Sequence, residues 1–259
     1  MNIERLFTQN ALRNYDYILT TSCGRTIVID PSDPPLLERS LHKVDYYLIT
    51  HEHGDHIAGL DRLPASFGGD IIGPKDLESI VSLDRVVKEG DHLFFEQEKI
   101  RVISIPGHIP SHIGFILYQG EKETAAFLGD TVFNGGVGNT RCGDSRILYK
   151  TIQEKVLNLS ENIVFYPEHD YWETNLKFCL DIDPQNKKAA GLLALYQSGN
   201  YRDRGMFPAA TIGEEKEYNL FFQTHLERVQ SLIRKRCGLS KECCEEDIFV
   251  ALRSLRDQW

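Results

Sequence analysis

The sequence predicts an α/β protein, in which a sandwich of strands and helices extends to about residue 172 and a helical portion follows. In the first part, short apolar or β-branched runs alternate with turn residues, a pattern typical of strands. In the second part, apolar residues recur at helical spacing. No Gly/Ser-rich linker separates the parts, so we expect the helical portion to be docked and not tethered.

The expected elements follow from these patterns. The strands are predicted at Tyr17–Thr20, Thr26–Ile29, Tyr46–Ile49, His92–Phe95, Ile100–Ile105, Ile113–Tyr118, Thr124–Leu128 and Ile163–Tyr166. A helix is predicted at Arg146–Leu157. The later helices are predicted at Asn175–Leu180, Asn186–Tyr196, Leu220–Lys235 and Glu245–Leu255.

The composition is that of a folded protein that functions in water. The chain has 259 residues, of which 41% are hydrophobic, so it can bury a sizeable core. No apolar run approaches the ~20 residues that span a bilayer. The segment Met1–Arg5 lacks the layout of a secretion signal. We expect a cytoplasmic protein, or an organelle matrix protein if a cleaved targeting segment is missing from this sequence.

The net charge argues against one class of binding partner, and the spacing of the cysteines indicates their chemical state. Lys and Arg total 29 and Asp and Glu total 38, and the net charge of −9 argues against broad nucleic-acid binding. It leaves room for a small basic pocket that binds an anionic small molecule. The six cysteines are scattered without C-x-x-C spacing and are predicted to be free thiols.

The strongest chemical signal is the segment Thr50–His56, which reads T-H-E-H-G-D-H and directly follows the apolar run Tyr46–Ile49. It crowds three imidazoles and the Asp55 carboxylate into one short stretch, with Glu52 among them. This mixed nitrogen and oxygen set suits divalent metals, with zinc the first choice. The alternative is a surface loop rich in histidine, which is disfavoured because so many ligands gather where a strand ends.

Three further candidates repeat one layout of strand, short turn and ligand. His108 follows the run that ends in Ile105-Pro106-Gly107, Asp130 follows Leu128-Gly129, and His169 follows Pro167-Glu168. Strand ends on one rim of a sandwich hold such ligands on a rigid scaffold. Each residue alone is as compatible with a structural role as with a ligand, but together they predict one site.

This pattern, H-x-H-x-D-H followed by His, Asp and His, resembles the metallo-β-lactamase superfamily. The resemblance implies a four-layer αβ/βα sandwich with two adjacent metal ions. It implies that His51, His53 and His108 bind the first ion. It implies that Asp55, His56 and His169 bind the second, and that Asp130 bridges both. Zinc is expected, and iron or manganese would also suit these ligands.

Several segments resemble the glyoxalase II (hydroxyacylglutathione hydrolase) family within that superfamily, and the resemblance covers the whole chain. The matching segments are Asn14–Tyr17, Ile27–Pro31, Ile105–His112, Asn175–Phe178, Asp183–Asn186, Phe207–Pro208 with Glu214–Glu215, Asn219 with Phe221, and Leu252–Trp259. The resemblance implies a catalytic domain at residues 1–172 and a helical substrate-binding domain at 173–259. It implies that His112 supports the catalytic ligands.

The same resemblance implies how substrate is bound. Tyr171, Arg253 and Arg256 fit positions that hold glutathione in the family. Guanidinium groups suit the two carboxylates of glutathione. The loop at Asn139 and Arg141 is also expected to contact substrate, although the family usually has a basic residue in place of Asn139 and an aromatic one in place of Arg141. Arg256 and Arg253 lie about one helical turn apart, so a solvated helix face is the alternative.

The family implies hydrolysis of a glutathione thioester of the S-lactoylglutathione type by a metal-bound hydroxide, giving a hydroxy acid and glutathione. The leaving thiol has a pKa near ~8.5, so no general acid is required. Asp55 is therefore expected to act as a ligand and not as a base, and Asp130 shares this catalytic role.

Two other functions remain open from the sequence. The segments Gly143–Tyr149 and Tyr166–Tyr171 also resemble persulfide dioxygenases of the same superfamily, which use a single iron. The helical C-terminal part favours the thioesterase, and so does His112, where those enzymes usually carry Cys. A binding protein with a degraded site is disfavoured because all seven metal ligands are present.

Overall fold

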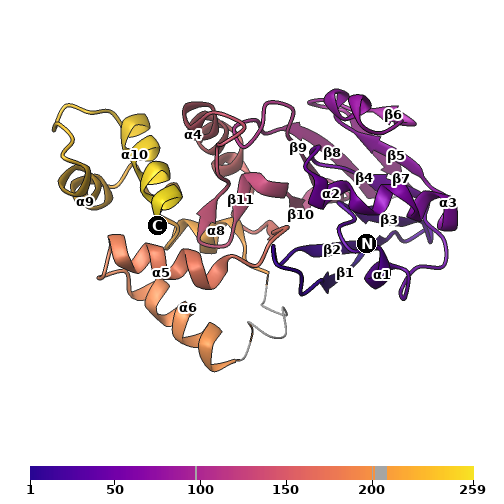
Figure 1. Cartoon of the computed structure of the whole chain (residues 1–259), viewed down its shortest axis with the longest axis horizontal. Helices are drawn as coiled ribbons and strands as arrows, with labels where there is room; N and C mark the ends of the chain where they lie inside the picture. Colours follow the sequence, from indigo (N-terminus) through magenta and orange to yellow (C-terminus); the bar gives the residue numbers. More distant parts are fainter. Residues whose placement is uncertain (97, 200, 202–208) are drawn as a thin grey trace. The chain divides into compact units, whose positions relative to one another are not determined.

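The computed structural model of the chain describes residues 1–96, 98–199, 201 and 209–259 (Figure 1). The family-like pair Phe207–Pro208 lies outside the described residues. The chain divides into two compact units, each made of several segments. Unit 1 contains Met1–Ile105, Ser111–Gly129 and Tyr166–His169, and unit 2 contains Pro106–Pro110, Asp130–Phe165 and Asp170–Trp259.

The described part of unit 1 contains a six-stranded sheet in the order β1-β2-β3-β4-β5-β6. Its strands are β1 (Asn2–Phe7), β2 (Tyr15–Thr20), β3 (Thr26–Ile29), β4 (Tyr46–Leu48), β5 (Asp70–Gly73) and β6 (Arg85–Val86). Strands β1, β2 and β3 are antiparallel neighbours, whereas β3 to β6 run parallel. Residues that directly follow β3 and β4 therefore meet at one edge of the sheet.

A five-stranded sheet has the order β13-β10-β9-β8-β7. Its strands are β7 (His92–Phe95), β8 (Glu98–Ser104), β9 (Ile113–Gln119), β10 (Lys122–Phe127) and β13 (Val164–Tyr166). Strands β7 to β10 form an antiparallel meander. Its long runs of buried apolar residues fit a sheet that is packed on a core.

The core of unit 1 follows from the alternation of side chains along each strand. On β2, Tyr17 and Leu19 join a buried cluster that also contains Val102 and Phe115 of the meander. The intervening Ile18 faces a second cluster on the other side of the sheet. That second cluster is completed by apolar residues of α1 (Pro34–Leu37), α3 (Leu63–Phe67) and the 3-10 turns η1 (Ala58–Asp61) and η2 (Lys75–Ser79). Unit 1 is thus a layered structure of helices, sheet and sheet.

Unit 2 contains a small hairpin and a group of helices. The hairpin strands are β11 (Val132–Phe133) and β12 (Gly136–Val137). The helices are α4 (Ser145–Glu154), α5 (Trp172–Ile182), α6 (Lys187–Ser198), α8 (Ile212–Lys216), α9 (Glu227–Cys237) and α10 (Glu245–Gln258). Helix α5 packs on α6, and α10 packs on both α4 and α9. None of the helices in the described part of the chain has the length and apolar character needed to cross a membrane.

Most of the predicted elements are present, and one predicted helix is wrong in extent. The continuous helix expected at Leu220–Lys235 is interrupted. Asn219 caps a short 3-10 turn, η5 (Leu220–Phe222), by accepting a hydrogen bond from the Phe221 amide with its side chain. Helix α9 then starts only at Glu227. Because Asn at a cap position satisfies the first amides of a new turn, it interrupts a pattern whose apolar spacing alone indicates a helix.

A buried polar network holds the hairpin of unit 2 to α8. The Glu215 side chain is fully buried. Its carboxylate accepts hydrogen bonds from Asn134 Nδ2 at 3.2 Å, the Gly135 amide at 2.8 Å, Asn219 Nδ2 at 3.1 Å and the Tyr218 hydroxyl. Burial raises the pKa of the Glu215 carboxyl from 4.5 to about 7, although these donors lower it.

This raised pKa predicts how stability depends on pH. Between pH 4.5 and about 7 the folded state holds a proton on Glu215 that the unfolded chain releases. The contribution of this group to stability is therefore complete at low pH and is lost as the pH rises through about 7. We expect the free energy of unfolding of the metal-free wild type to fall relative to that of Glu215→Gln between pH 5 and about pH 7, and the comparison to level off above that pH. Urea unfolding at several pH values measures it.

The matched control is Glu217→Gln, because Glu217 is an exposed carboxylate at the end of the same helix. Its difference from the wild type should stay nearly constant over the same pH range. A wild type that gains stability relative to Glu215→Gln as the pH rises would contradict the raised pKa of Glu215. It would mean that the folded state favours the ionised carboxylate.

Candidate metal centre

The metal motif starts where β4 ends and continues into the short helix α2 (Gly54–Ile57). His51 directly follows this strand edge and is fully buried. His53 forms the N-terminal boundary of α2, and Asp55 and His56 lie within it. The helical turn therefore orients the side chains of Asp55 and His56 differently from the way an extended loop would orient them.

Hydrogen bonds indicate the tautomers of three predicted ligand imidazoles in unit 1. The Thr50 hydroxyl donates to Asp30 at 2.5 Å, so at 2.9 Å it accepts the Nδ1 proton of His51. His56 Nδ1 donates to the same Asp30 carboxylate at 2.9 Å, and His169 Nδ1 donates to the Leu12 carbonyl at 2.9 Å. Each ring therefore presents its Nε2 as a lone-pair donor, which is the form that binds a metal ion.

One ligand group lies wholly in unit 1 and consists of Asp55, His56 and His169. Asp55 Oδ2 lies 3.5 Å from His56 Nε2 and 3.4 Å from His169 Nε2. Ligands about 2.0–2.1 Å from a tetrahedral zinc ion are separated by about 3.3–3.4 Å. The spacing of these three atoms therefore fits a common metal ion.

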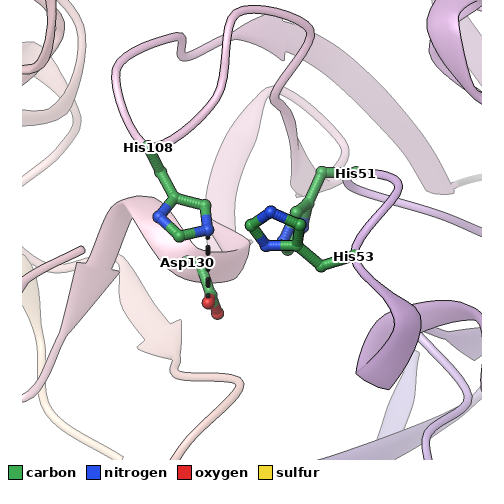
Figure 2. A group of neighbouring side chains, drawn as sticks. All are labelled: His51, His53, His108 and Asp130. Atoms are coloured by element: carbon green, nitrogen blue, oxygen red, sulfur yellow. Dashed lines mark hydrogen bonds and ion pairs between the residues drawn. The ribbon is translucent and has the colours of Figure 1, made fainter. Parts of the chain in front are cut away.

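The other predicted ligands also come together. His108 Nε2 lies 3.6 Å from Asp130 Oδ2, and His51 Nε2 lies 3.1 Å from His53 Nδ1. The four side chains form one group whose ligand atoms all lie within 4.8 Å of one another (Figure 2). His108 Nδ1 donates to the Asn139 carbonyl at 2.7 Å, which again leaves Nε2 for the metal. That Asp130 bridges to the Asp55 group remains a prediction.

The structure adds two positioning residues that sequence reasoning missed. Asp30 follows β3 and binds Thr50 and His56, as described above, and it also accepts a hydrogen bond from the Thr50 amide at 2.7 Å. Asn14 is buried and donates from Nδ2 to Asp55 Oδ2 at 3.0 Å. Asp30 follows the end of β3, so the pattern of a strand end followed by a carboxylate marks it in the sequence, but its contacts with Thr50 and His56 depend on the parallel pairing of β3 with β4, which that pattern does not reveal.

His112 is buried beside the motif and is not in any group of ligand atoms among the described residues. Its ring stacks on His51, with centroids 4.5 Å apart and an angle of 21° between the planes. Its Nδ1 donates to the Ile113 carbonyl at 3.0 Å. The stacking fits a group that holds the His51 ring in place.

The predicted substrate residues lie in unit 2 and differ in exposure. Arg141 is exposed, Asn139, Tyr171 and Arg256 are partly buried, and Arg253 is buried. The Tyr171 ring packs edge-on against Phe133 with centroids 5.1 Å apart. Arg256 donates from Nε and Nη2 to Asn175 Oδ1 at 3.3 and 3.2 Å.

These arginines influence one another electrostatically. Burial above all, together with the charges of Arg256 and Arg141, lowers the pKa of the Arg253 guanidinium to about 10, against the opposing effect of Asp257. Burial also lowers the pKa of Arg256. Arg253 thus lies within the electrostatic influence of Arg256 and Arg141, and that these arginines bind a carboxylate of the substrate stays a prediction.

The fold and its His/Asp groups define a member of the metallo-β-lactamase superfamily, whose model matches residues 12–170. A second model, described as the hydroxyacylglutathione hydrolase C-terminus, matches residues 170–259. The chain belongs to the hydroxyacylglutathione hydrolase family, as the sequence predicted. The α/β class, the superfamily fold and the helical C-terminal part are thereby confirmed.

Individual relatives agree with this assignment over their full length. The hydroxyacylglutathione hydrolase of Polaromonas sp. is 34% identical over 271 residues, covering 100% of both chains. That of Nitrosococcus oceani is 33% identical over 268 residues, again covering 100% of both chains. Among solved structures, ETHE1 from Myxococcus xanthus has a TM-score of 0.65 at 20% identity and covers 99% of this chain and 100% of its own. At this identity the likeness shows a shared fold alone.

Proposed function

We propose that this protein hydrolyses a glutathione thioester of the S-lactoylglutathione type to a hydroxy acid and glutathione. The observation that carries the proposal is the full-length similarity to enzymes named hydroxyacylglutathione hydrolase, in a chain that keeps all the expected ligand side chains. On this proposal the protein is a thioester hydrolase with a small-molecule substrate. We further propose that it acts in the cytoplasm, and that residues 173–259 serve as the substrate-binding domain.

We propose that the two ligand groups hold a pair of divalent ions, with zinc preferred because imidazole nitrogen and carboxylate oxygen suit it. Iron or manganese is the alternative occupant. When bound, such ions supply a water of lowered pKa and a Lewis acid for the thioester carbonyl. Asp55 and Asp130 contribute carboxylate oxygens to these groups, and His112 steadies His51 through ring stacking.

On this proposal the leaving thiolate needs no general acid from the protein. The cysteine thiol of glutathione has a pKa of about 8.5, so its thiolate departs without a proton donor at neutral pH. This agrees with a site whose imidazole Nδ1 protons are already used in hydrogen bonds to Asp30, Leu12 and Asn139. The catalytic side chains therefore act by holding and orienting groups.

We propose that the thiol half of the substrate is held in unit 2 by Arg256, Arg141, Tyr171 and Asn139. Arg141 is exposed and supplies a positive charge close to the usual basic position of the family, which Asn139 fills here. Arg253 adds its charge to the same cluster, although its guanidinium is turned to backbone carbonyls. The cluster provides the positive field that the two carboxylates of glutathione require.

The proposed function is tested by two assays on the zinc-loaded or iron-loaded protein. We expect release of glutathione from S-lactoylglutathione, and no oxygen uptake when glutathione persulfide is the substrate. Oxygen uptake without thioester cleavage would place the chain with the persulfide dioxygenases instead. Elemental analysis of the same preparation should give two metal ions per chain for the hydrolase and one iron for the dioxygenase.

The proposed substrate contact predicts a specific change in kinetics. Arg256→Ala is expected to raise KM for S-lactoylglutathione about tenfold or more, because a charged hydrogen bond is worth roughly 1.5–3 kcal/mol. The contact is far from the bond that breaks, so kcat should stay within about twofold. Steady-state kinetics measure both constants.

Arg236→Ala is the matched control, because this arginine lies on α9 and pairs with Asp181 at 2.7 Å. It should leave both constants unchanged. An unchanged KM in Arg256→Ala would mean that this arginine serves only its contact with Asn175 and that the thiol half binds elsewhere.

A further inference from the structure

Arg253 is an unusual residue for a surface helix, because its side chain is buried within unit 2. Only 4% of the residue is exposed. Its Nη1 donates to the carbonyl oxygens of Val137 at 2.8 Å and Gly138 at 3.3 Å. Its Nη2 donates to Asp257 Oδ1 at 2.9 Å, and its guanidinium carbon lies 5.4 Å from the centre of the Phe221 ring. The guanidinium is thus used within the protein.

The segment that Arg253 holds is the one that contacts two of the metal ligands. The carbonyl of Asn139, next in the chain after Gly138, accepts the Nδ1 proton of His108 at 2.7 Å. The Gly138 amide donates to the Thr131 carbonyl at 3.2 Å, beside Asp130. A side chain at Gly138 would overlap the Asp130 carbonyl, at a distance of 1.8 Å. A shift of this segment would therefore move both ligands.

We infer that Arg253 is a positioning residue that orients His108 and Asp130 for metal binding by holding the backbone of Val137–Asn139. Two of its hydrogen bonds go to backbone carbonyls of Val137 and Gly138, so Arg253 acts on the backbone of this segment and not on its side chains. The contact links α10 to the backbone of Val137, 116 residues earlier, and through the residues that follow it to His108 and Asp130. A role for the C-terminal helix in forming the metal site follows from it.

Binding substrate directly would require Arg253 to give up these bonds. A buried guanidinium that loses its acceptors incurs a desolvation cost, and the two carbonyls would lose their donor as well. Arg256 is only partly buried on the same helix, and its bonds to Asn175 Oδ1 at 3.3 and 3.2 Å go to a side chain, which can turn away more readily than a backbone carbonyl. The two arginines should therefore differ in kind, with Arg256 affecting substrate binding and Arg253 affecting the metal site.

The experiment compares Arg253→Met, Arg253→Lys and Arg256→Ala with the wild type. Zinc affinity of the metal-free proteins is measured by competition with a chelator, without substrate. We expect Arg253→Met to weaken one of the two binding steps by about 10- to 100-fold, as is usual for residues that support metal ligands. Arg253→Lys keeps the charge but has a single ammonium group, so its step should weaken less. Arg256→Ala should bind zinc like the wild type.

Kinetics provide the second measurement, and this part rests on the proposed function. At fixed zinc, Arg253→Met is expected to lower kcat for S-lactoylglutathione with KM unchanged within about twofold. Normal zinc binding with a tenfold higher KM would overturn the inference and assign Arg253 to substrate. Normal zinc binding with normal kinetics would overturn it as well.

The outcomes remain separable if a variant or the proposed function fails. If Arg253→Met does not fold, as judged by circular dichroism, Arg253→Lys carries the zinc measurement, and an unchanged affinity in it overturns the inference. If the wild type does not cleave S-lactoylglutathione, the proposed function fails while the zinc comparison still decides the role of Arg253.

Discussion

Replacing Asp130 with alanine is expected to lower kcat/KM for S-lactoylglutathione by about a thousandfold or more. Asp130 Oδ2 lies 3.6 Å from His108 Nε2 and belongs to the group with His51 and His53. We propose that its carboxylate is shared between two metal ions. Several kcal/mol of transition-state stabilisation would depend on those ions, and each 1.36 kcal/mol changes the rate tenfold. Elemental analysis of the variant should show fewer than two metal ions per chain.

The control for this substitution is Asp61→Ala, which removes an exposed carboxylate shortly after the metal motif. It should keep the metal content and the rate of the wild type. Two metal ions and a near-normal rate in Asp130→Ala would mean that the bridging assignment is wrong. One retained ion with the rate lost would locate Asp130 at a single ion.

The sequence predicted which His and Asp side chains come together, because an apolar run shows where a strand ends; that these side chains bind metal stays a prediction. The run Tyr46–Ile49 predicts a strand, and β4 is found at Tyr46–Leu48. A residue that shortly follows a buried strand is held in place by that strand. The position of His51 could therefore be predicted from the run Tyr46–Ile49 alone. The same reasoning placed His108, Asp130 and His169 among the ligands.

The supporting contacts could not be predicted in this way, because they depend on pairing between strands and on backbone groups. Asp30 reaches Thr50 and His56 since β3 and β4 are parallel neighbours, and the spacing of apolar residues does not reveal that pairing. Asp30 also has a positive φ of 46°, which is a consequence of its tertiary contacts. That Asn139 contacts substrate stays a prediction, whereas the hydrogen bond of its carbonyl to His108 was not predicted.

The helix at the C-terminus shows how periodicity and burial differ in what they predict. The spacing of Arg253 and Arg256 predicts that both lie on one face of a helix, and α10 contains both. It does not predict that Arg253 is 4% exposed while its neighbour is only partly buried. Burial is set by the hairpin strand β12 and by Phe221, which are remote in sequence. The two residues therefore have different expected roles despite matching family positions.

A single methyl group at Gly138 is expected to disrupt the metal site and lower stability. A Cβ at this position would lie 1.8 Å from the Asp130 carbonyl oxygen and 3.3 Å from His108 Nδ1. The closest atom belongs to the backbone, so no rotation of a side chain relieves the overlap. We expect Gly138→Ala to cost about 3 kcal/mol, which corresponds to a Tm lower by roughly 6 to 12 °C. Calorimetry and elemental analysis measure the two effects.

Gly191→Ala is the matched control, because Gly191 lies exposed in α6 and a Cβ there would meet nothing within 4 Å. This change should leave metal content unaffected and raise stability by up to about 1 kcal/mol, since alanine favours helices more than glycine does. If Gly138→Ala kept the Tm of the wild type and both metal ions, the close approach of this segment to Asp130 would be wrong. The contact through which Arg253 is inferred to act on Asp130 would then be lost, and its influence would reach the metal site through His108 alone.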